Sequence, residues 1–353
     1  MTDYLALPPA REVRGVVVAP PSKSATNRAL VLAALSEETV EIARPLFCGD
    51  TSSLSRCLSA MGASIHRSPG GLRVHGPLSA KGNPEVTLDA GESGTAARFL
   101  TALAAATPGR FRLTAAPRLL ERPIAELVAA LRSRGAEIEY LDAQGCLPLS
   151  IRGGHFQPGS VAVDASRSSQ FLSALLLVGA AFAEGVEVSA TGEIVSAPYV
   201  TTTLETLKAF GHQVTEGSSL QVARGSRRVE RYHVPGDFSS AVPLLAAVGV
   251  AGGDVTVEGL TWPSEDADAS AVAVLERMGV AISAGPRSLR ASCRPGRLSP
   301  VCLTATDFPD AVPALAALAA LAPGRSRFEG IGHLRWKESD RIAACASLVS
   351  GAG

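Results

Sequence analysis

The chain has 353 residues, of which 46% are hydrophobic and 19% charged, and its formal net charge at pH 7 is zero. This length predicts two domains with a sizeable core, and the balanced charge argues against a general nucleic-acid binder. The richest apolar stretch, residues 171–182, is too short to span a membrane.

The first residues and the cysteines indicate a cytoplasmic protein. Residues 1–4 lack the basic and apolar regions that open a signal peptide. The six cysteines form no CxxC pair and have no His partner at metal-binding spacing. We therefore expect most of them to be buried thiols, and no metal site.

The chain is organised around residues 20–30, which read PPSKSATNRAL. The prolines end a valine-rich strand, and an Ala- and Leu-rich helix follows whose first residues include hydroxyl side chains suited to an N-cap. Lys23 and Arg28 lie near the start of this helix, where each cation costs about 0.3–1 kcal/mol. A bound anion would reverse the sign of that cost; the alternative is a capped helix with solvated cations.

An apolar helix that ends in glycine and is followed by a short strand recurs along the chain. The glycines are Gly62, Gly135, Gly211 and Gly279, which lie 73, 76 and 68 residues apart. Each occupies the position after a helix where a positive φ is needed. The period is too long for a solenoid and predicts a repeated globular module of helices and strands.

The end of the chain extends this pattern. Residues 347–351 resemble one more helix that ends in glycine, and the chain stops where the next strand is expected. We therefore expect the chain to be truncated relative to a complete protein. The alternative is a frayed natural terminus.

Further cations stand near helix starts. The glycine-rich turn at residues 91–95 allows a ligand to approach the backbone, and Arg98 follows early in the next helix. Arg122 precedes Pro123, which suits the first position of a helix predicted over residues 124–131. The alternative for Arg122 is an ordinary loop arginine.

Ser168, Ser169 and Gln170 open a nearly apolar helix and offer more hydrogen-bonding groups than one cap requires. Ser196 stands before another helix in the same way. This surplus suits a polyhydroxy or phosphorylated ligand; the alternative is one capping serine with solvated neighbours. Residues 235–236, Pro-Gly, mark a domain crossover.

Two acids, Asp310 and Glu338, are candidates for proton transfer. Asp310 opens a helix, where stabilisation of the helix dipole is the simpler explanation. Lys337 and Arg341 are four residues apart, and we expect these like charges to share a helix face that an anion would stabilise. Glu338 and Asp340 could instead neutralise them.

The cations share one property that matters more than any single motif. Lys23, Arg28, Arg98, Arg122 and Arg341 all lie near helix starts in different repeats. If the repeat is a structural module, these helix N-termini can converge on a cleft with a strong positive field. Such a cleft would bind small, multiply anionic ligands.

With these motifs in place, the chain resembles the 3-phosphoshikimate 1-carboxyvinyltransferase family, also called 5-enolpyruvylshikimate-3-phosphate synthases. The likeness covers essentially the whole chain and rests on PSKSATNRA (21–29), GESGTAARFL (91–100), LERPI (120–124), SSQFLSALL (168–176), SAPYV (196–200), GDFSSA (236–241), FPDA (308–311) and LRWKESDRI (334–342). It implies an α/β (α+β) protein, a two-domain inside-out α/β barrel of repeated βαβαββ-type units. One domain would combine residues 1–20 and 236–353, and the other would span 21–235.

The resemblance implies transfer of the enolpyruvyl group of phosphoenolpyruvate to the 5-hydroxyl of shikimate 3-phosphate by addition and elimination. The implied catalytic residues are Lys23, Asp310, toward the hydroxyl, and Glu338, toward the methyl proton. Arg122, Arg341 and the Gly94 backbone would hold phosphoenolpyruvate. The full implied substrate-binding set is Lys23, Ser24, Arg28, Gly94, Arg122, Ser168, Ser169, Gln170, Ser196, Asp310, His333, Lys337 and Arg341. We expect a monomer with no cofactor, whose only partners are these substrates.

The chain departs from the family at a few positions. His333 stands where Asn is frequent and Phe99 where Pro is common, and a late His-Arg pair and Lys have no counterpart. The alternatives are a fragment that binds shikimate 3-phosphate without turnover, and the sister enzyme acting on UDP-N-acetylglucosamine. The latter uses a loop cysteine, and no cysteine lies between Cys57 and Cys146.

Overall fold

The computed structural model describes residues 12–79, 85–225, 228–294 and 296–351. The chain divides into two compact units, the first formed by Met1–Pro20, Gly236–Ile331 and Arg341–Gly353 and the second by Pro21–Pro235 and Gly332–Asp340. The domain bounds expected from the sequence stay a prediction. They differ from these units at Gly332–Asp340, which groups with the second unit.

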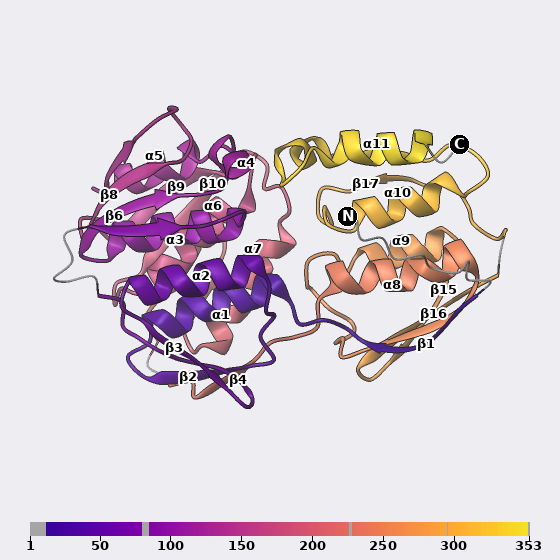
Figure 1. The fold of residues 1–353 in the computed structure, drawn as a ribbon, viewed down its shortest axis with the longest axis horizontal. Coiled ribbons are helices and arrows are strands. Elements are labelled where there is room, and N and C mark those ends of the chain that lie inside the picture. The colour runs from indigo at the N-terminus through magenta and orange to yellow at the C-terminus, as the bar shows by residue number, and fades with distance from the viewer. Residues whose placement is uncertain (1–11, 80–84, 226–227, 295, 352–353) are drawn as a thin grey trace, which may run out of the picture. The chain divides into compact units, whose positions relative to one another are not determined.

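The second unit mixes strands and helices (Figure 1). Its strands are β2 Thr39–Ala43, β3 Ser64–Ser68, β4 Gly71–His75, β5 Val86–Asp89, β6 Gly109–Thr114, β7 Glu137–Tyr140, β8 Leu149–Gly153, β9 Gly159–Asp164, β10 Val186–Thr191, β11 Gln213–Glu216, β12 Leu220–Ala223 and β13 Arg231–His233. Its helices are α1 Lys23–Leu35, α2 Gly49–Ala60, α3 Gly94–Ala106, α4 Pro117–Leu120, α5 Ala125–Ser133, α6 Ser169–Gly179, α7 Pro198–Ala209 and the 3₁₀ helix η1 Gly332–Trp336.

The sheets of the second unit share one topology. Their strand orders are β13-β2-β4-β3, β5-β6-β8-β7 and β9-β10-β12-β11. In each, the first pair is parallel and the later pairs are antiparallel. A parallel pair requires a crossover connection, which α3 supplies between β5 and β6 and α6 between β9 and β10. The predicted repeat of a module of helices and strands is confirmed.

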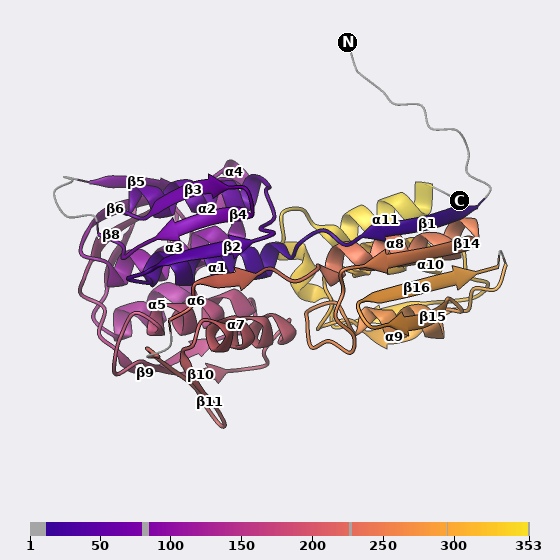
Figure 2. The same cartoon turned by 90° about the horizontal axis from the view of Figure 1, so that it is seen from below.

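The first unit uses the same pattern. It contains β1 Val13–Val18, α8 Phe238–Ala251, β14 Gly253–Glu258, α9 Ala271–Arg277, β15 Ala281–Gly285, β16 Ser288–Cys293, β17 Cys302–Thr304, α10 Val312–Ala320, β18 Arg327–Glu329 and α11 Arg341–Gly351. Figure 2 shows the sheet β1-β14-β16-β15, which again begins with a parallel pair. Strands β17 and β18 form a further parallel pair.

Glycine ends the helices as the sequence predicts. Gly62, Gly135, Gly211 and Gly279 follow α2, α5, α7 and α9 with φ of 107°, 86°, 80° and 97°. A side chain strains such a backbone, which explains the residue type. The strands β3, β7, β11 and β15 then begin within two residues of these glycines.

The strands exchange partners where the chain crosses between the units. β1 leads into α1 but pairs with β14, which follows α8. β13 leads into α8 but pairs with β2, which follows α1. The sheet of the first unit therefore includes β1, which precedes the second unit in the chain, and a sheet of the second unit includes β13, which precedes α8 of the first unit.

The core of the second unit lies around α1, α3 and α6. These helices are buried along most of their length, with Leu30, Phe99, Phe171 and Leu175 at 1% exposure or less. Helices that are apolar on nearly all sides are buried on nearly all sides. Within the described residues, no helix combines the length and apolar character that a membrane crossing requires.

Candidate functional site

The helices α1, α3 and α6 each begin at a serine N-cap. The hydroxyl of Ser22 accepts from the Ala25 N–H (3.2 Å), that of Ser93 from Ala96 N–H (3.1 Å) and that of Ser168 from Gln170 N–H (3.2 Å). One side-chain oxygen satisfies only part of the set of N–H groups that a helix start presents. These ends of the central helices are therefore suited to an anion.

Two buried arginines, Arg98 and Arg122, lie beside Gly94 in the second unit. Arg98 and Arg122 are 3% and 7% exposed. Arg98 Nη1 donates to the Gly94 carbonyl (3.3 Å) and Nη2 to the Pro123 carbonyl (2.8 Å). Arg122 lies so close to Gly94 that a Cβ added there would be 2.7 Å from Nη1.

The charges of this cluster act on one another. Burial and, to a smaller extent, the positive charge of Arg122 lower the pKa of Arg98 to about 9, although the Glu338 carboxylate acts in the opposite direction. Glu338 Oε1 lies 3.4 Å from Arg122 Nη1. The sequence places Arg98 near a helix start, and the structure adds that its guanidinium donates to the carbonyl of Gly94.

Lys23 is the first residue of α1, and its ammonium lies 3.1 Å from Asp50 Oδ2. Asp50 is in the first turn of α2. No sequence signal identified Asp50, since an acid in the first turn of a helix is ordinary. Its carboxylate holds the Lys23 side chain without burying it, because the lysine side chain is 42% exposed.

Gln170 presents an acceptor at the start of α6. Its Nε2 donates to Thr95 Oγ1 (3.1 Å), which comes from α3. Its Oε1 is buried and has no hydrogen-bond partner among the described residues. Leaving a buried acceptor unsatisfied costs about 1–3 kcal/mol, so a ligand hydroxyl that donates here would be favoured.

Ser196 does not introduce its helix as Ser168 does. Helix α7 begins at Pro198 with Ala197 as its N-cap, and no side chain caps it. Ser196 is 4% exposed and has a φ of 56°, which is unusual for a residue other than glycine. Its carbonyl accepts from the Tyr199 N–H (3.1 Å).

The expectation that Lys337 and Arg341 share a helix face is wrong. Gly332–Trp336 forms the short helix η1, and α11 begins only at Arg341. Lys337 and Glu338 lie in the non-helical residues between these elements. His333, in η1, is 9% exposed.

Asp310 and Arg341 lie together in the first unit. The Arg341 guanidinium donates from Nη1 to Asp310 Oδ1 and to the Pro309 carbonyl (3.4 Å). Asp268, which is fully buried, accepts from the backbone N–H groups of Asp310 (3.0 Å) and Ala311 (2.8 Å) through Oδ1. Sequence reasoning missed Asp268, because 42 residues separate it from Asp310.

The candidate residues therefore fall into two sets. The first unit holds Asp310 and Arg341. The second unit holds Lys23, Ser24, Arg28, Gly94, Arg122, Ser168, Ser169, Gln170, Ser196, His333, Lys337 and Glu338.

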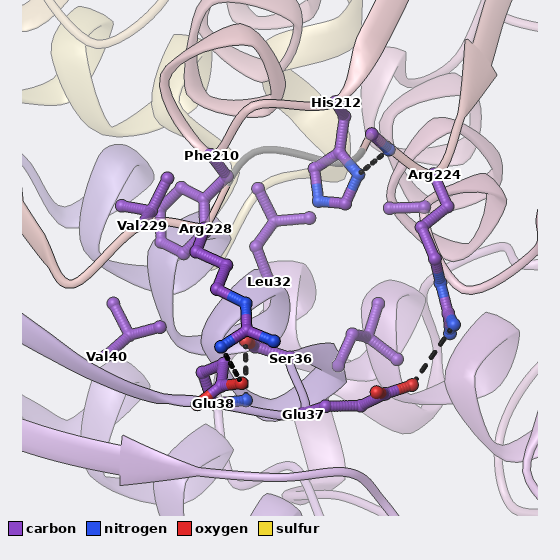
Figure 3. A pocket seen from close by; sticks show the side chains of 13 residues that line it. Leu32, Ser36, Glu37, Glu38, Val40, Phe210, His212, Arg224, Arg228 and Val229 are labelled. Atoms are coloured by element: carbon purple, nitrogen blue, oxygen red, sulfur yellow. Dashed lines mark hydrogen bonds and ion pairs between the residues drawn. The ribbon is translucent and has the colours of Figure 1, made fainter.

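A hollow of about 170 Å³ lies in the second unit, and none of these candidate residues is among those that line it (Figure 3). Ser36 and Phe210, which end α1 and α7, line it together with His212 and Arg224. Burial, with a contribution from the charge of Arg224, lowers the pKa of His212 to about 4. His212 is therefore neutral at pH 7, and its Nδ1 accepts from the Gly225 N–H (3.4 Å).

Solved structures place this fold among the enolpyruvyl transferases. The chain is similar to EPSP synthase from Acinetobacter baumannii, with a TM-score of 0.77 and 27% identity over 97% of this chain and 79% of that one. It also matches the enolpyruvyl transferase NikO from Streptomyces tendae, with a TM-score of 0.68 and 19% identity over 90% of this chain and 75% of that one. At that identity the second likeness concerns the fold alone. The predicted fold class is confirmed.

Sequence comparison then gives the family. The family described as EPSP synthase (3-phosphoshikimate 1-carboxyvinyltransferase) matches residues 8–350. A protein of that name from Thermococcus kodakarensis is 41% identical over 98% of this chain and 82% of its own length. One from Halobacterium salinarum is 39% identical over 99% of this chain and 82% of its own length. The chain belongs to the EPSP synthase family; its expected truncation stays a prediction.

Proposed function

We propose that this chain transfers the enolpyruvyl group of phosphoenolpyruvate to the 5-hydroxyl of shikimate 3-phosphate and releases phosphate, a step toward aromatic amino acids. Family membership supports the reaction. The structural observation that carries it is the pair of buried arginines, Arg98 and Arg122, beside the Gly94 backbone.

This cluster suits phosphoenolpyruvate because that substrate carries a carboxylate and a phosphate on three carbons. Two buried guanidinium groups repel each other in a medium of low dielectric constant. A small dianion offsets this repulsion and accepts charge-assisted hydrogen bonds. We assign Arg122 and the Gly94 backbone to phosphoenolpyruvate, and Arg341 of the first unit to the same substrate.

Shikimate 3-phosphate requires a different set of groups, since it carries hydroxyls as well as anionic groups. The hydroxyls of Ser168 and Ser169 and the buried acceptor of Gln170 match hydroxyl and phosphate oxygens. The remaining residues assigned to shikimate 3-phosphate are Ser24, Arg28, Ser196, Asp310 and His333. Lys23 is assigned to both substrates, and Lys337 completes the proposed substrate-binding set. The domain bounds and these residue roles are proposals that follow the family resemblance.

The reaction needs a proton donor and a proton acceptor. Protonation of phosphoenolpyruvate C3 accompanies attack of the 5-oxygen on C2, and the hydroxyl proton leaves to a base. Loss of a proton from the new methyl group then expels phosphate. We assign Asp310 as the base toward the hydroxyl and Glu338, with Lys23, to the protons at C3. The contact of Glu338 with Arg122 places this carboxylate beside the group assigned to phosphoenolpyruvate.

We further propose that the chain works in the cytoplasm as a monomer, without nucleic acid. A net charge of zero supports the last point.

The deciding experiment is release of phosphate from phosphoenolpyruvate in the presence and absence of shikimate 3-phosphate. We expect release only with both substrates, and its loss in Arg122→Ala. Phosphate release that does not depend on shikimate 3-phosphate would contradict the proposal. Binding of shikimate 3-phosphate without any release would identify the alternative, a non-catalytic binding protein.

A further inference from the structure

Arg28 is held inside the second unit by an unusual number of groups. It is 2% exposed and is among the largest fully buried side chains. Within the described part of the chain, its guanidinium donates from Nε to Thr203 Oγ1 (2.7 Å), from Nη1 to the Ser24 carbonyl (3.0 Å), and from Nη2 to the Tyr199 carbonyl (2.8 Å) and Ser173 Oγ (3.3 Å). These four acceptors are uncharged oxygens, so they orient the guanidinium through hydrogen-bond geometry.

The two hydroxyls form a directed pair. Thr203 and Ser173 are both fully buried, and their oxygens are 2.8 Å apart. Because a guanidinium N–H can only donate, Thr203 Oγ1 must accept from Arg28. The Thr203 proton is then directed to Ser173 Oγ or to the Tyr199 carbonyl, which lies 2.9 Å away. The Thr203 hydroxyl therefore fixes the plane of the guanidinium through its Nε edge.

A fourth helix covers the arginine. The ring of Phe99, from α3, is 1% exposed, and its centroid lies 5.5 Å from Arg28 Cζ. Such a cation–π contact is strongest when it is desolvated. Arg28 itself belongs to α1, Ser173 to α6 and Thr203 to α7.

This arrangement is more than core packing. A buried cation costs free energy that an apolar side chain of similar size would not. Arg28 donates back to the carbonyl of Ser24, in the first turn of α1, where the candidate anion site lies. We propose that Thr203 and Ser173 are positioning residues that hold Arg28 in the orientation needed for shikimate 3-phosphate. This inference rests on the proposed function.

Thr203→Val tests it, since valine keeps the shape and removes the hydroxyl. Because the variant loses a hydrogen bond to a charged group, we expect the Kd of shikimate 3-phosphate to rise about tenfold, which corresponds to about 1.4 kcal/mol. The KM of phosphoenolpyruvate should change far less. Thr203→Ser restores the oxygen and should restore the affinity. Ser173→Ala, which removes a longer bond, should have a smaller effect in the same direction.

Thr206→Val is the matched control. Thr206 is buried in the same helix, and its hydroxyl donates to the Thr202 carbonyl (2.7 Å) as Thr203 can to Tyr199. Within the part of the chain that the structure describes, Thr206 makes no hydrogen bond to Arg28. An equal loss of affinity in Thr206→Val, or an unchanged Kd in Thr203→Val and Ser173→Ala, would overturn the inference.

A second arm tests whether the effect passes through Arg28. In an Arg28→Ala background, Thr203→Val should have no further effect on the Kd of shikimate 3-phosphate. A full additional loss would show that Thr203 acts by another route and would overturn the inference. Failure of the wild-type chain to bind shikimate 3-phosphate would instead refute the proposed function, which distinguishes the two failures.

Discussion

Gly94→Ala should weaken phosphoenolpyruvate binding without unfolding the protein. A Cβ at this position would lie 2.7 Å from Arg122 Nη1, 2.9 Å from Nη2 and 3.0 Å from Cζ. These distances are shorter than carbon contacts allow, so the guanidinium must move. The backbone itself accepts alanine, because Gly94 is the first residue of α3 and is not one of the described glycines with a positive φ.

The size of the effect follows from what Arg122 does. The Arg122 side chain is 8% exposed and contacts Glu338. A shift of its guanidinium should therefore misalign the N–H groups that would donate to a bound anion. One hydrogen bond to a charged group contributes about 1.5–3 kcal/mol, and we expect the KM of phosphoenolpyruvate to rise about tenfold or more. Alanine favours a helix over glycine by up to about 1 kcal/mol, so the Tm should not fall much.

Steady-state kinetics with each substrate varied in turn, together with thermal unfolding, test this prediction. Gly49→Ala is a matched control, because Gly49 also begins a helix and a Cβ there meets nothing within 4 Å. A Gly94→Ala variant that folds and keeps its KM for phosphoenolpyruvate would refute the steric reasoning. So would an equal effect of Gly49→Ala.

Three further predictions follow from other groups. Arg98→Lys should raise the KM of phosphoenolpyruvate, because an ammonium cannot reproduce the hydrogen bonds of the guanidinium to the Gly94 and Pro123 carbonyls, and an unchanged KM would contradict this reasoning. The pKa of His212 is lowered to about 4 in the folded chain, so the unfolded chain binds the proton first as the pH falls. The free energy of unfolding should therefore decrease between about pH 6.5 and pH 4, by at most about 3 kcal/mol. In urea unfolding at both ends of this range, His212→Gln should reduce that pH dependence. Asp268→Ala removes the carboxylate that accepts from the N–H groups of Asp310 and Ala311. It should destabilise the protein by about 1–3 kcal/mol and lower kcat. An unchanged kcat would show that Asp268 does not position Asp310.

Local chemistry made much of the fold predictable. A glycine that ends a helix and a serine that begins one act within a few residues, so Gly62 and Ser168 could be assigned from the sequence. The repeat of such signals then predicted a module that the strand orders confirm. The exchange of β1 and β13 carries no local signal, because pairing partners in a sheet are set by contacts distant in sequence.

The site was less predictable for the same reason. Ser173 and Thr203 lie 145 and 175 residues from the arginine that they hold, and each looks like an ordinary buried helix residue. The spacing of Lys337 and Arg341 suggested one helix face, but spacing cannot reveal that the helix begins only at Arg341. Residue type at a helix start was a better guide than periodicity near the end of the chain.

Arg28 and Arg98 show why cations recur near the starts of the central helices. Each donates from Nη1 to the carbonyl of the residue four positions earlier, Ser24 in α1 and Gly94 in α3. Side chains of a helix point toward its N-terminus, so an arginine in the second turn delivers its charge to the first. There it adds to the partial positive charge of the helix start rather than opposing it. A guanidinium at such a helix start is disfavoured unless negative charge lies nearby, so the repetition of this arrangement favours ligands that carry anionic groups.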